Sequence, residues 1–276
     1  MGSVPQKRRD DLDRWERNRL HWEENVDAQN LGRSGSANLR LDLALYATAD
    51  FREACAFLSP LKDQLILDLG GGLGLAAIFF ARRGAHVIVA DLSLPRLRAA
   101  RDLAQQAGVS EQITFLQCSA EALPFRDGGL DRQFTKSVLI HTKLAATAAE
   151  LDRTLAPDGK ACFIEPFDNS PLVNLYRRLA APGEWKDITR YFNREALAEL
   201  LGGFSRETRR PSVRYRYLFA FLATPFNYIL RMPKAYRAAE VMLLALDNAL
   251  FALMPATRRW AWFGLIRIEP RRSADS

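Results

Sequence analysis

The feature that most constrains this chain is a glycine-rich turn that directly follows a short apolar run. Residues 65–75 read LILDLGGGLGL, so the run ends around Asp68 and then passes through a cluster of glycines into a helix-like segment. Glycine at positions 70, 72 and 74 lets the backbone adopt positive φ and lets a ligand approach to contact distance. The amide groups that open the next helix then point toward that ligand. This order of strand, turn and helix predicts a cofactor site.

A second acidic residue stands where a nucleotide ribose needs a partner. Residues 86–91 read HVIVAD, a short buried strand that ends in Asp91. It lies about twenty residues after the turn, where a carboxylate can accept both ribose hydroxyls. The glycines fall at positions 70, 71, 72 and 74. This G-x-G-x-G register differs from the G-x-G-x-x-G of dinucleotide sites.

These motifs resemble those of the class I methyltransferases that use S-adenosylmethionine. Later stretches fit the family in order: ITFLQCSAEALPF at 113–125, DGGLD at 127–131, LAPDG at 155–159 and KACFIEP at 160–166. The β–α alternation through these stretches predicts an α/β fold. The resemblance implies a doubly wound, mostly parallel seven-stranded sheet of Rossmann-like type. N-terminal helices form a cap over 1–58, and the methyltransferase domain spans 59–276 with helical insertions at about 166–190 and 217–256.

The resemblance also implies which residues bind S-adenosyl-L-methionine. Asp68 fixes its aminoacyl end, directly or through water, and Leu92 forms an adenine wall. Many relatives carry an Asp for the adenine amino group where this chain has Ser119. That contact therefore falls to Ser119 itself, Glu121 or a backbone carbonyl. The full set of expected cofactor residues is Asp68, Gly70, Gly72, Gly74, Asp91, Leu92, Ser119, Ala120, Glu121 and Lys136, with no metal.

Two side chains are candidates for the chemistry. His141 follows the predicted fourth strand, beside the place where the methyl group should point, and imidazole suits proton transfer near neutrality. Glu165 is a carboxylate at the end of the next strand and a candidate for substrate contact. A packing or hydrogen-bonding role is the alternative for His141.

The charge of the chain is unevenly distributed. Its formal net charge is +7, yet residues 206–272 hold thirteen Lys or Arg against four acids. The arginines near 206–216 fit either a solvated strand face or a surface for anionic lipid or substrate. No nucleic-acid-binding motif accompanies the charge, so nucleic acid is not expected as a partner. Three scattered cysteines favour a reducing cytosol, and no signal peptide or membrane-spanning run is expected.

Two segments outside the repeated β–α pattern are informative. Trp15, Trp22 and Val26 recur at helical spacing within 8–30, which predicts an amphipathic helix that lies over the site. Residues 217–256 are apolar nearly all round. They fit a buried helix, a lid over an apolar pocket, or a surface helix that enters an anionic bilayer peripherally.

The sequence therefore predicts methyl transfer from S-adenosylmethionine to a small, apolar or lipid-like acceptor. The predicted location is the cytoplasm, with peripheral contact at the inner face of a membrane. An NAD(P)-dependent oxidoreductase and a non-catalytic cofactor-binding or scaffold protein remain alternatives. The sequence indicates neither the acceptor atom nor the oligomeric state.

Overall fold

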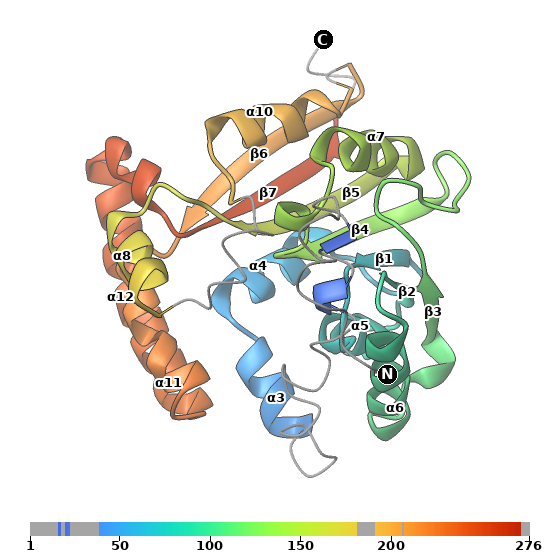
Figure 1. Ribbon diagram of the computed structural model, residues 1–276, viewed down its shortest axis with the longest axis horizontal. Coiled ribbons are helices and arrows are strands. Elements are labelled where there is room, and N and C mark those ends of the chain that lie inside the picture. Colours follow the sequence, from blue (N-terminus) through green and yellow to red (C-terminus); the bar gives the residue numbers. More distant parts are fainter. Residues whose placement is uncertain (1–15, 18–19, 23–38, 181–190, 206, 272–276) are drawn as a thin grey trace.

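The computed structural model describes residues 16–17, 20–22, 39–180, 191–205 and 207–271. Within these residues, seven strands form one mixed sheet with the order β3-β2-β1-β4-β5-β7-β6 (Figure 1). The strands are β1 (Leu65–Leu69), β2 (His86–Asp91), β3 (Ile113–Gln117), β4 (Leu130–Lys136), β5 (Leu155–Pro166), β6 (Arg209–Arg216) and β7 (Phe263–Pro270). The first five are parallel, and β7 runs antiparallel to both β5 and β6. The predicted doubly wound sheet is confirmed.

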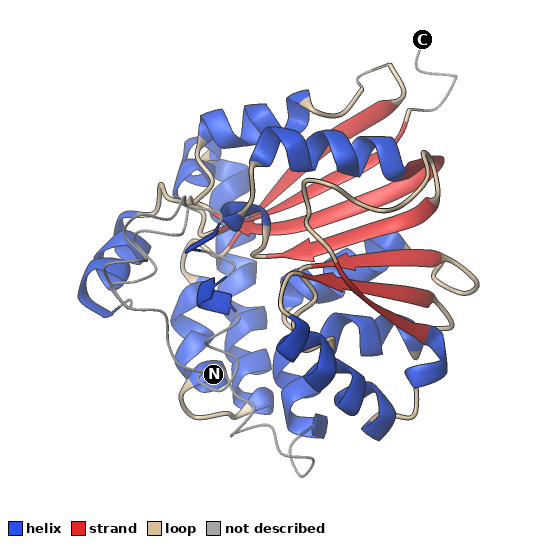
Figure 2. Cartoon of the chain, turned by 45° about the vertical axis from the view of Figure 1, so that its right-hand side comes forward, coloured by secondary structure: helices blue, strands red, loops and turns tan. Residues whose placement is uncertain are grey.

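Helices cover both faces of this sheet (Figure 2). They are α3 (Leu39–Tyr46), α4 (Ala49–Leu58), α5 (Leu75–Ala81), α6 (Leu94–Gln106), α7 (Leu144–Thr154), α8 (Pro171–Ala180), α10 (Arg194–Gly202), α11 (Thr224–Tyr228) and α12 (Pro233–Leu253). Short 3-10 turns are η3 (Ser110–Gln112), η4 (Leu139–His141), η5 (Ala220–Ala223) and η6 (Pro255–Trp260). Trp15, Val26 and residues 181–190 of the expected insertion lie outside the described residues. The boundary at 58/59 between the N-terminal cap and the methyltransferase domain stays a prediction.

Two apolar cores lie on the two faces because successive strand residues point to opposite sides. Ile66 packs with residues of α3, α4, α5 and α6, whereas the adjacent Leu67 packs with residues of α7 and α10. Both side chains are fully buried. The alternation fixes the sheet between two helical layers, so the carboxyl ends of β1, β2 and β4 meet at one edge, where ligands bind in folds of this kind.

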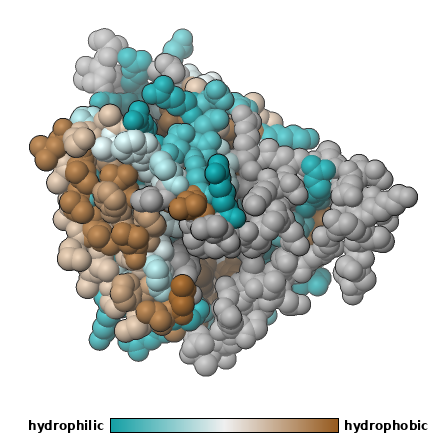
Figure 3. All heavy atoms as spheres, turned by 60° about the vertical axis from the view of Figure 1, so that its left-hand side comes forward, coloured by the Kyte–Doolittle hydropathy of each residue, from teal (hydrophilic) through white to brown (hydrophobic). Residues whose placement is uncertain are grey.

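The C-terminal segment 217–256 is buried on one side only, where Leu218 and Phe251 form a small apolar cluster with Ala261. It forms η5, α11 and α12, and apolar side chains gather on its outer face (Figure 3). The buried residues of α12 are Tyr236, Glu240, Asp247 and Phe251. One face of α12 is therefore in contact with the protein body, and the opposite face is exposed and apolar. No helix among the described residues meets the length and hydropathy needed to span a bilayer.

Three arginines of the basic strand β6 have partners within the protein. Arg209 is buried and donates to the carbonyl oxygens of Leu155, Ala156 and Pro157 at 2.8–2.9 Å. Arg214 and Arg216 both form ion pairs with Glu53 of α4. These three arginines thus support the fold, whereas the expectation for Arg206 lies outside the described residues.

Candidate active site

The glycine turn after β1 is tightly confined by its neighbours. Gly70 and Gly72 have φ values of +64° and +54°, which side chains of L-residues rarely adopt. A Cβ at Gly70 would lie 2.4 Å from Val138 Cγ2, and one at Gly72 would lie 2.4 Å from Arg96 Nη2. The turn therefore needs glycine at both positions. Gly74 precedes the first residue of α5, has a φ of +70°, and faces Ala100 of α6, so it serves both the turn and the packing of the two helices.

Asp91 ties the glycine turn to the end of β2. Its Oδ2 accepts a hydrogen bond from the Gly72 amide at 2.9 Å, and its Oδ1 accepts one from the Ser93 amide at 2.9 Å. Ser93 in turn accepts from the Arg96 amide and so caps the start of α6. One carboxylate thus fixes the geometry of both βα turns and still lines a cavity. Each oxygen keeps a second lone pair with which it can accept from a ligand hydroxyl.

Two cavities meet at the glycine turn. The first has a volume of about 230 Å³, and the second, larger one has a volume of about 510 Å³. Gly70, Arg96 and Lys136 line both, so the cavities adjoin. The first is also lined by Trp22, Leu69, Ala90, Asp91, Leu92, Cys118, Ala120, Glu121, Ser137, Val138, His141 and Thr142. The second is also lined by Asp42, Leu45, Tyr46, Thr48, Gly71, Gly72, Leu73, Leu75, Asn227 and Arg231.

Asp68 provides a buried carboxyl group beneath the glycine turn. It is 2 % exposed, and its Oδ2 has no hydrogen-bond partner among the described residues. Burial, and next the charge of Asp91, raise the pKa of Asp68 to about 8. A cationic group bound at the turn would compensate this carboxylate. S-adenosylmethionine carries positive charge at its sulfonium and ammonium groups, so the site fits this cofactor.

The loop after β3 contributes to the first cavity through two of its three predicted residues. Ala120 and Glu121 line the cavity, as does Leu92 after β2. Ser119 is not among the lining residues, and its hydroxyl binds the Glu121 carboxylate. The other Glu121 oxygen accepts from the Lys143 amide at 2.9 Å. Ser119 therefore orients Glu121, which is the side chain on the cavity wall.

His141 stands at the end of η4, on the wall of the first cavity. Its ring packs edge-to-face on Trp22, with the ring centroids 5.2 Å apart. Trp22 also stacks under the Arg96 guanidinium at 5.0 Å. Trp22 belongs to the N-terminal segment that was predicted to lie over the site, and it lines the first cavity.

Glu165 lies behind this wall and not on it. The residue is fully buried, and its Oε1 accepts from the amides of Val138 and Leu139 at 3.1 and 3.0 Å. It also accepts from the Thr135 hydroxyl at 3.2 Å. Burial raises the pKa of Glu165 to about 7 despite these hydrogen bonds. The structure places Glu165 as the anchor of the turn that carries His141, away from the positions that a substrate could contact.

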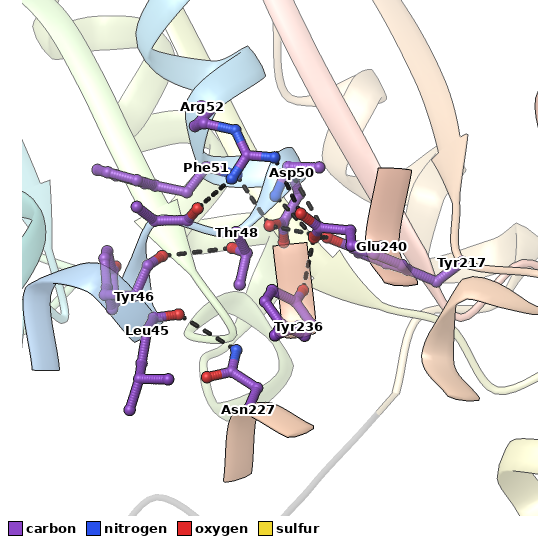
Figure 4. A network of polar contacts seen from close by, with 12 residues as sticks. Leu45, Tyr46, Thr48, Asp50, Phe51, Arg52, Tyr217, Asn227, Tyr236 and Glu240 are labelled. Carbon is purple, nitrogen blue, oxygen red and sulfur yellow. Dashed lines mark hydrogen bonds and ion pairs between the residues drawn. The ribbon is translucent and has the colours of Figure 1, made fainter. Parts of the chain in front are cut away.

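Lys136 ends β4 and reaches toward α3 and α4. Its Nζ donates to Thr48 Oγ1 at 3.0 Å, lies 3.4 Å from Asp50 Oδ2, and sits 5.1 Å from the centre of the Tyr46 ring. Burial opposes ionisation of Asp50, but Lys136 and the surrounding hydrogen bonds outweigh it and lower the pKa of Asp50. Figure 4 shows this network continuing from Asp50 through Tyr217 to Glu240 of α12.

Several lining residues carry no signal that sequence reasoning could use. Arg96 and Thr48 belong to ordinary helical stretches, and Arg231 belongs to the segment expected to be apolar. Only the fold brings them to the glycine turn. Among the described residues, no group of three or more His, Cys, Asp or Glu side chains is arranged to hold a metal.

Comparison with known proteins agrees with this geometry. A family model described as a methyltransferase domain matches residues 66–159. A ubiquinone/menaquinone biosynthesis C-methyltransferase of Acidiphilium cryptum is 34% identical over 116 residues, 41% of this chain and 47% of the relative. The corresponding protein of Vibrio cholerae is 41% identical over 120 residues, 41% of this chain and 46% of the relative. The chain thus spans about half the length of these curated relatives.

The solved structures agree in fold over nearly the whole chain. A geranyl diphosphate C-methyltransferase from Streptomyces coelicolor superposes with a TM-score of 0.63 and 15% identity, covering 95% of this chain and 99% of its own. That structure contains S-adenosyl-L-homocysteine. Residues 66–159 therefore match a methyltransferase domain, and the chain has the Rossmann-like fold of this solved methyltransferase.

Proposed function

We propose that this chain transfers the methyl group of S-adenosylmethionine to a small, apolar or lipid-like acceptor. One observation carries the proposal: a second cavity adjoins the cofactor cavity at Gly70, Arg96 and Lys136. Apolar side chains of α3 and the glycine turn, including Leu45 and Leu73, form part of its wall. A molecule in this cavity would lie next to the bound cofactor. The curated relatives are named as C-methyltransferases of ubiquinone and menaquinone biosynthesis, and the structural neighbour as a geranyl diphosphate C-methyltransferase, which supports an acceptor of this class.

The residues of the chain would hold the cofactor at the first cavity. Asp91 would bind its ribose, the backbone at Gly70 and Gly72 would lie against its aminoacyl end, and Asp68 would balance its positive charge. Leu92, Ala120 and Glu121 would surround the adenine. The cofactor supplies an activated methyl group, so the protein mainly has to hold the acceptor in line with it and keep out water.

His141 is proposed as the base that removes a proton from the acceptor. Its ring lies on the wall of the first cavity, against Trp22, within the same lining as Gly70 and Lys136. Glu165 is a positioning residue in this scheme, because it accepts from the amides that begin η4 and so fixes the backbone before His141.

The apolar acceptor leads us to propose that the protein acts in the cytoplasm, in peripheral contact with the inner face of a membrane. The net charge of +7 favours such a contact with an anionic surface. The exposed apolar side chains of α11 and α12 support the same location.

The test is transfer of radiolabelled methyl from S-adenosylmethionine into a cell extract separated into lipid, polar metabolite and protein fractions. The proposal expects label in the lipid fraction with the wild-type chain, and little label with Gly70→Val, whose side chain cannot fit the turn. Asp102→Asn, an exposed change on α6, is the matched control and should label like wild type. Label confined to polar metabolites would contradict the acceptor class. Tight cofactor binding without label in any fraction would contradict catalysis.

A further inference from the structure

The outer surface of the C-terminal helices is apolar to an unusual degree. Met242 and Leu253 of α12 are 67% and 80% exposed, and Ile229 after α11 is 75% exposed. Such residues occur from η5 to just after α12, on the side where apolar atoms gather in Figure 3, and we call this surface the α11–α12 face. It consists of Leu222, Phe226, Ile229, Leu230, Met232, Val241, Met242, Leu246, Leu253 and Met254. Monomeric soluble proteins rarely leave a large contiguous apolar patch without a use.

The inner face of α12 is polar, which fixes its orientation. Glu240 is fully buried, accepts from the Ala49 amide and from Arg52 Nη2 at 2.9 Å each, and also accepts from the hydroxyls of Tyr217 and Tyr236 (Figure 4). Rotation of α12 to bury its apolar side would expose this cluster and leave buried donors without their acceptor. The helix therefore presents its apolar side outward by construction.

A second buried carboxylate, two turns after Glu240, fixes the same helix. Asp247 is fully buried and accepts from the amides of Leu218, Phe219 and Ala220 at 2.8–3.1 Å. Asp247 thus ties α12 to η5 through three backbone hydrogen bonds. Glu240 and Asp247 lie two turns apart in the middle of α12, so together they fix which side of the helix faces outward.

The charges around the α11–α12 face have one sign. The acids between 217 and 260 are Glu240 and Asp247, and both are buried. Four exposed cations accompany the apolar side chains: Lys234 and Arg237 at the start of α12, and Arg258 and Arg259 after its end. An outward surface that combines apolar and cationic side chains is the pattern of helices that lie in the interface of an anionic membrane.

We propose that the α11–α12 face docks on an anionic lipid bilayer, with α12 lying in the headgroup region and the four cations contacting lipid phosphates. A second copy of this chain is a poorer occupant. A two-fold interface brings the same patch of each copy together, so it would place these cations opposite one another with no exposed acid in the 217–260 segment to pair with them. A bilayer surface supplies both the apolar phase and the negative charge.

The docking face also lies at the back of the acceptor cavity. Asn227 and Arg231 line the second cavity, while their neighbours Phe226, Ile229 and Leu230 are exposed. A bilayer on this face would place its lipid phase one helix away from the cavity. This access route rests on the proposed acceptor class, whereas docking itself does not require turnover.

Vesicle co-sedimentation of the full chain tests docking without any acceptor. Vesicles of phosphatidylcholine mixed with phosphatidylglycerol should bind the protein, and vesicles of phosphatidylcholine alone should bind it far less. Lys234→Gln combined with Arg237→Gln should weaken binding about 30-fold, since each cation near the surface contributes about 1 kcal/mol and 1.4 kcal/mol is tenfold. Raising the salt to about 1 M should also weaken binding, because it shortens the Debye length from about 10 to about 3 Å.

The apolar contribution needs a separate variant and a matched control. Val241→Asn, Met242→Gln and Leu246→Gln together should weaken vesicle binding by about a hundredfold. Lys62→Gln with Arg82→Gln removes two exposed cations outside the α11–α12 face, just before β1 and just after α5, and should bind like wild type. Unchanged S-adenosylmethionine affinity would show that each variant is folded.

Two results would overturn docking. One is equal sedimentation with neutral and anionic vesicles. The other is a combination of two observations. Sedimentation velocity would show a concentration-dependent dimer of the wild type that the apolar triple variant does not form, and vesicles would bind neither the wild type nor the triple variant. Vesicle binding together with label only in polar metabolites would leave docking intact and refute the acceptor class, so the two failures are distinguishable.

Discussion

The buried carboxyl of Asp68 should make stability depend on pH in a way that one substitution removes. Its pKa rises to about 8, from an ordinary value of 3.8, because of burial and the nearby charge of Asp91. Between these two values the folded state holds a proton that the unfolded state has released. The free energy of unfolding therefore falls as pH rises through this window, by up to about 1.4 kcal/mol per pH unit from this group.

Asp68→Asn keeps the shape of the side chain and cannot titrate. The difference in unfolding free energy between the variant and wild type should thus grow in favour of the variant by about 1.4 kcal/mol per unit from about pH 5 to about pH 7. Urea denaturation at several pH values measures it, with the exposed Asp102→Asn as control. Glu165, whose pKa is raised to about 7, adds a slope of the same sign that is common to all three proteins.

The cofactor provides a second test of the same carboxyl. Saturating S-adenosylmethionine brings positive charge to the turn and favours the ionised form of Asp68, so the wild-type slope should shrink. Asp68→Asn should weaken cofactor binding by about 1–3 kcal/mol, the range for a lost charge-assisted hydrogen bond. Parallel stability curves for Asp68→Asn and wild type, together with equal cofactor affinity, would refute the reasoning.

Three further substitutions probe the site. Asp91→Ala should weaken S-adenosylmethionine binding by about 1–3 kcal/mol while the protein stays folded, as calorimetric titration and circular dichroism can show; unchanged affinity would contradict its ribose role. Gly70→Val should destabilise the fold by more than the roughly 1–2 kcal/mol that a left-handed backbone conformation costs a residue with a side chain, because the valine would also overlap Val138. A normal melting temperature of this variant would argue against the confined turn. His141→Ala should reduce turnover by about 10²–10⁴ with cofactor affinity retained. Near-normal activity of the variant, together with a pH–rate profile that shows no ionisation near neutrality, would mean that His141 has only a packing role.

The sequence predicted the parallel part of the sheet and its cofactor edge well. Strands such as 86–91 alternate with amphipathic helices, and glycines and prolines mark the turns, so local chemistry determines these elements. Gly70, Asp91 and Leu92 lie on the cavity as expected, because the end of a parallel strand fixes where the next residues point.

Other features depend on contacts between segments that are distant in the chain. Lys136 was expected at the cofactor, and it lines both cavities, but its ammonium group turns toward Thr48 and Asp50 of the N-terminal helices. Glu165 was expected to contact substrate, yet its position next to the η4 amides buries it completely. The local sequence predicts neither the partners of Lys136 nor those of Glu165.

The orientation of α12 also could not be predicted from the sequence. Its residues are apolar nearly all round, so periodicity could not choose which side faces inward. The choice depends on Glu240 and Asp247, whose partners at Ala49, Arg52 and 218–220 become neighbours only in the folded chain.

The central claim is that the cavity beside Asp91 binds S-adenosylmethionine for methyl transfer to an apolar acceptor in the adjoining cavity. Its most direct test is quantification of S-adenosylhomocysteine formed with a lipid extract, alongside the methylated lipid identified by mass spectrometry. Wild type and Asp102→Asn should form one S-adenosylhomocysteine for each methylated lipid molecule, and Asp91→Ala at limiting cofactor should form much less of both. Product formation that Asp91→Ala leaves unchanged, or cofactor binding without S-adenosylhomocysteine from any lipid fraction, would contradict the account.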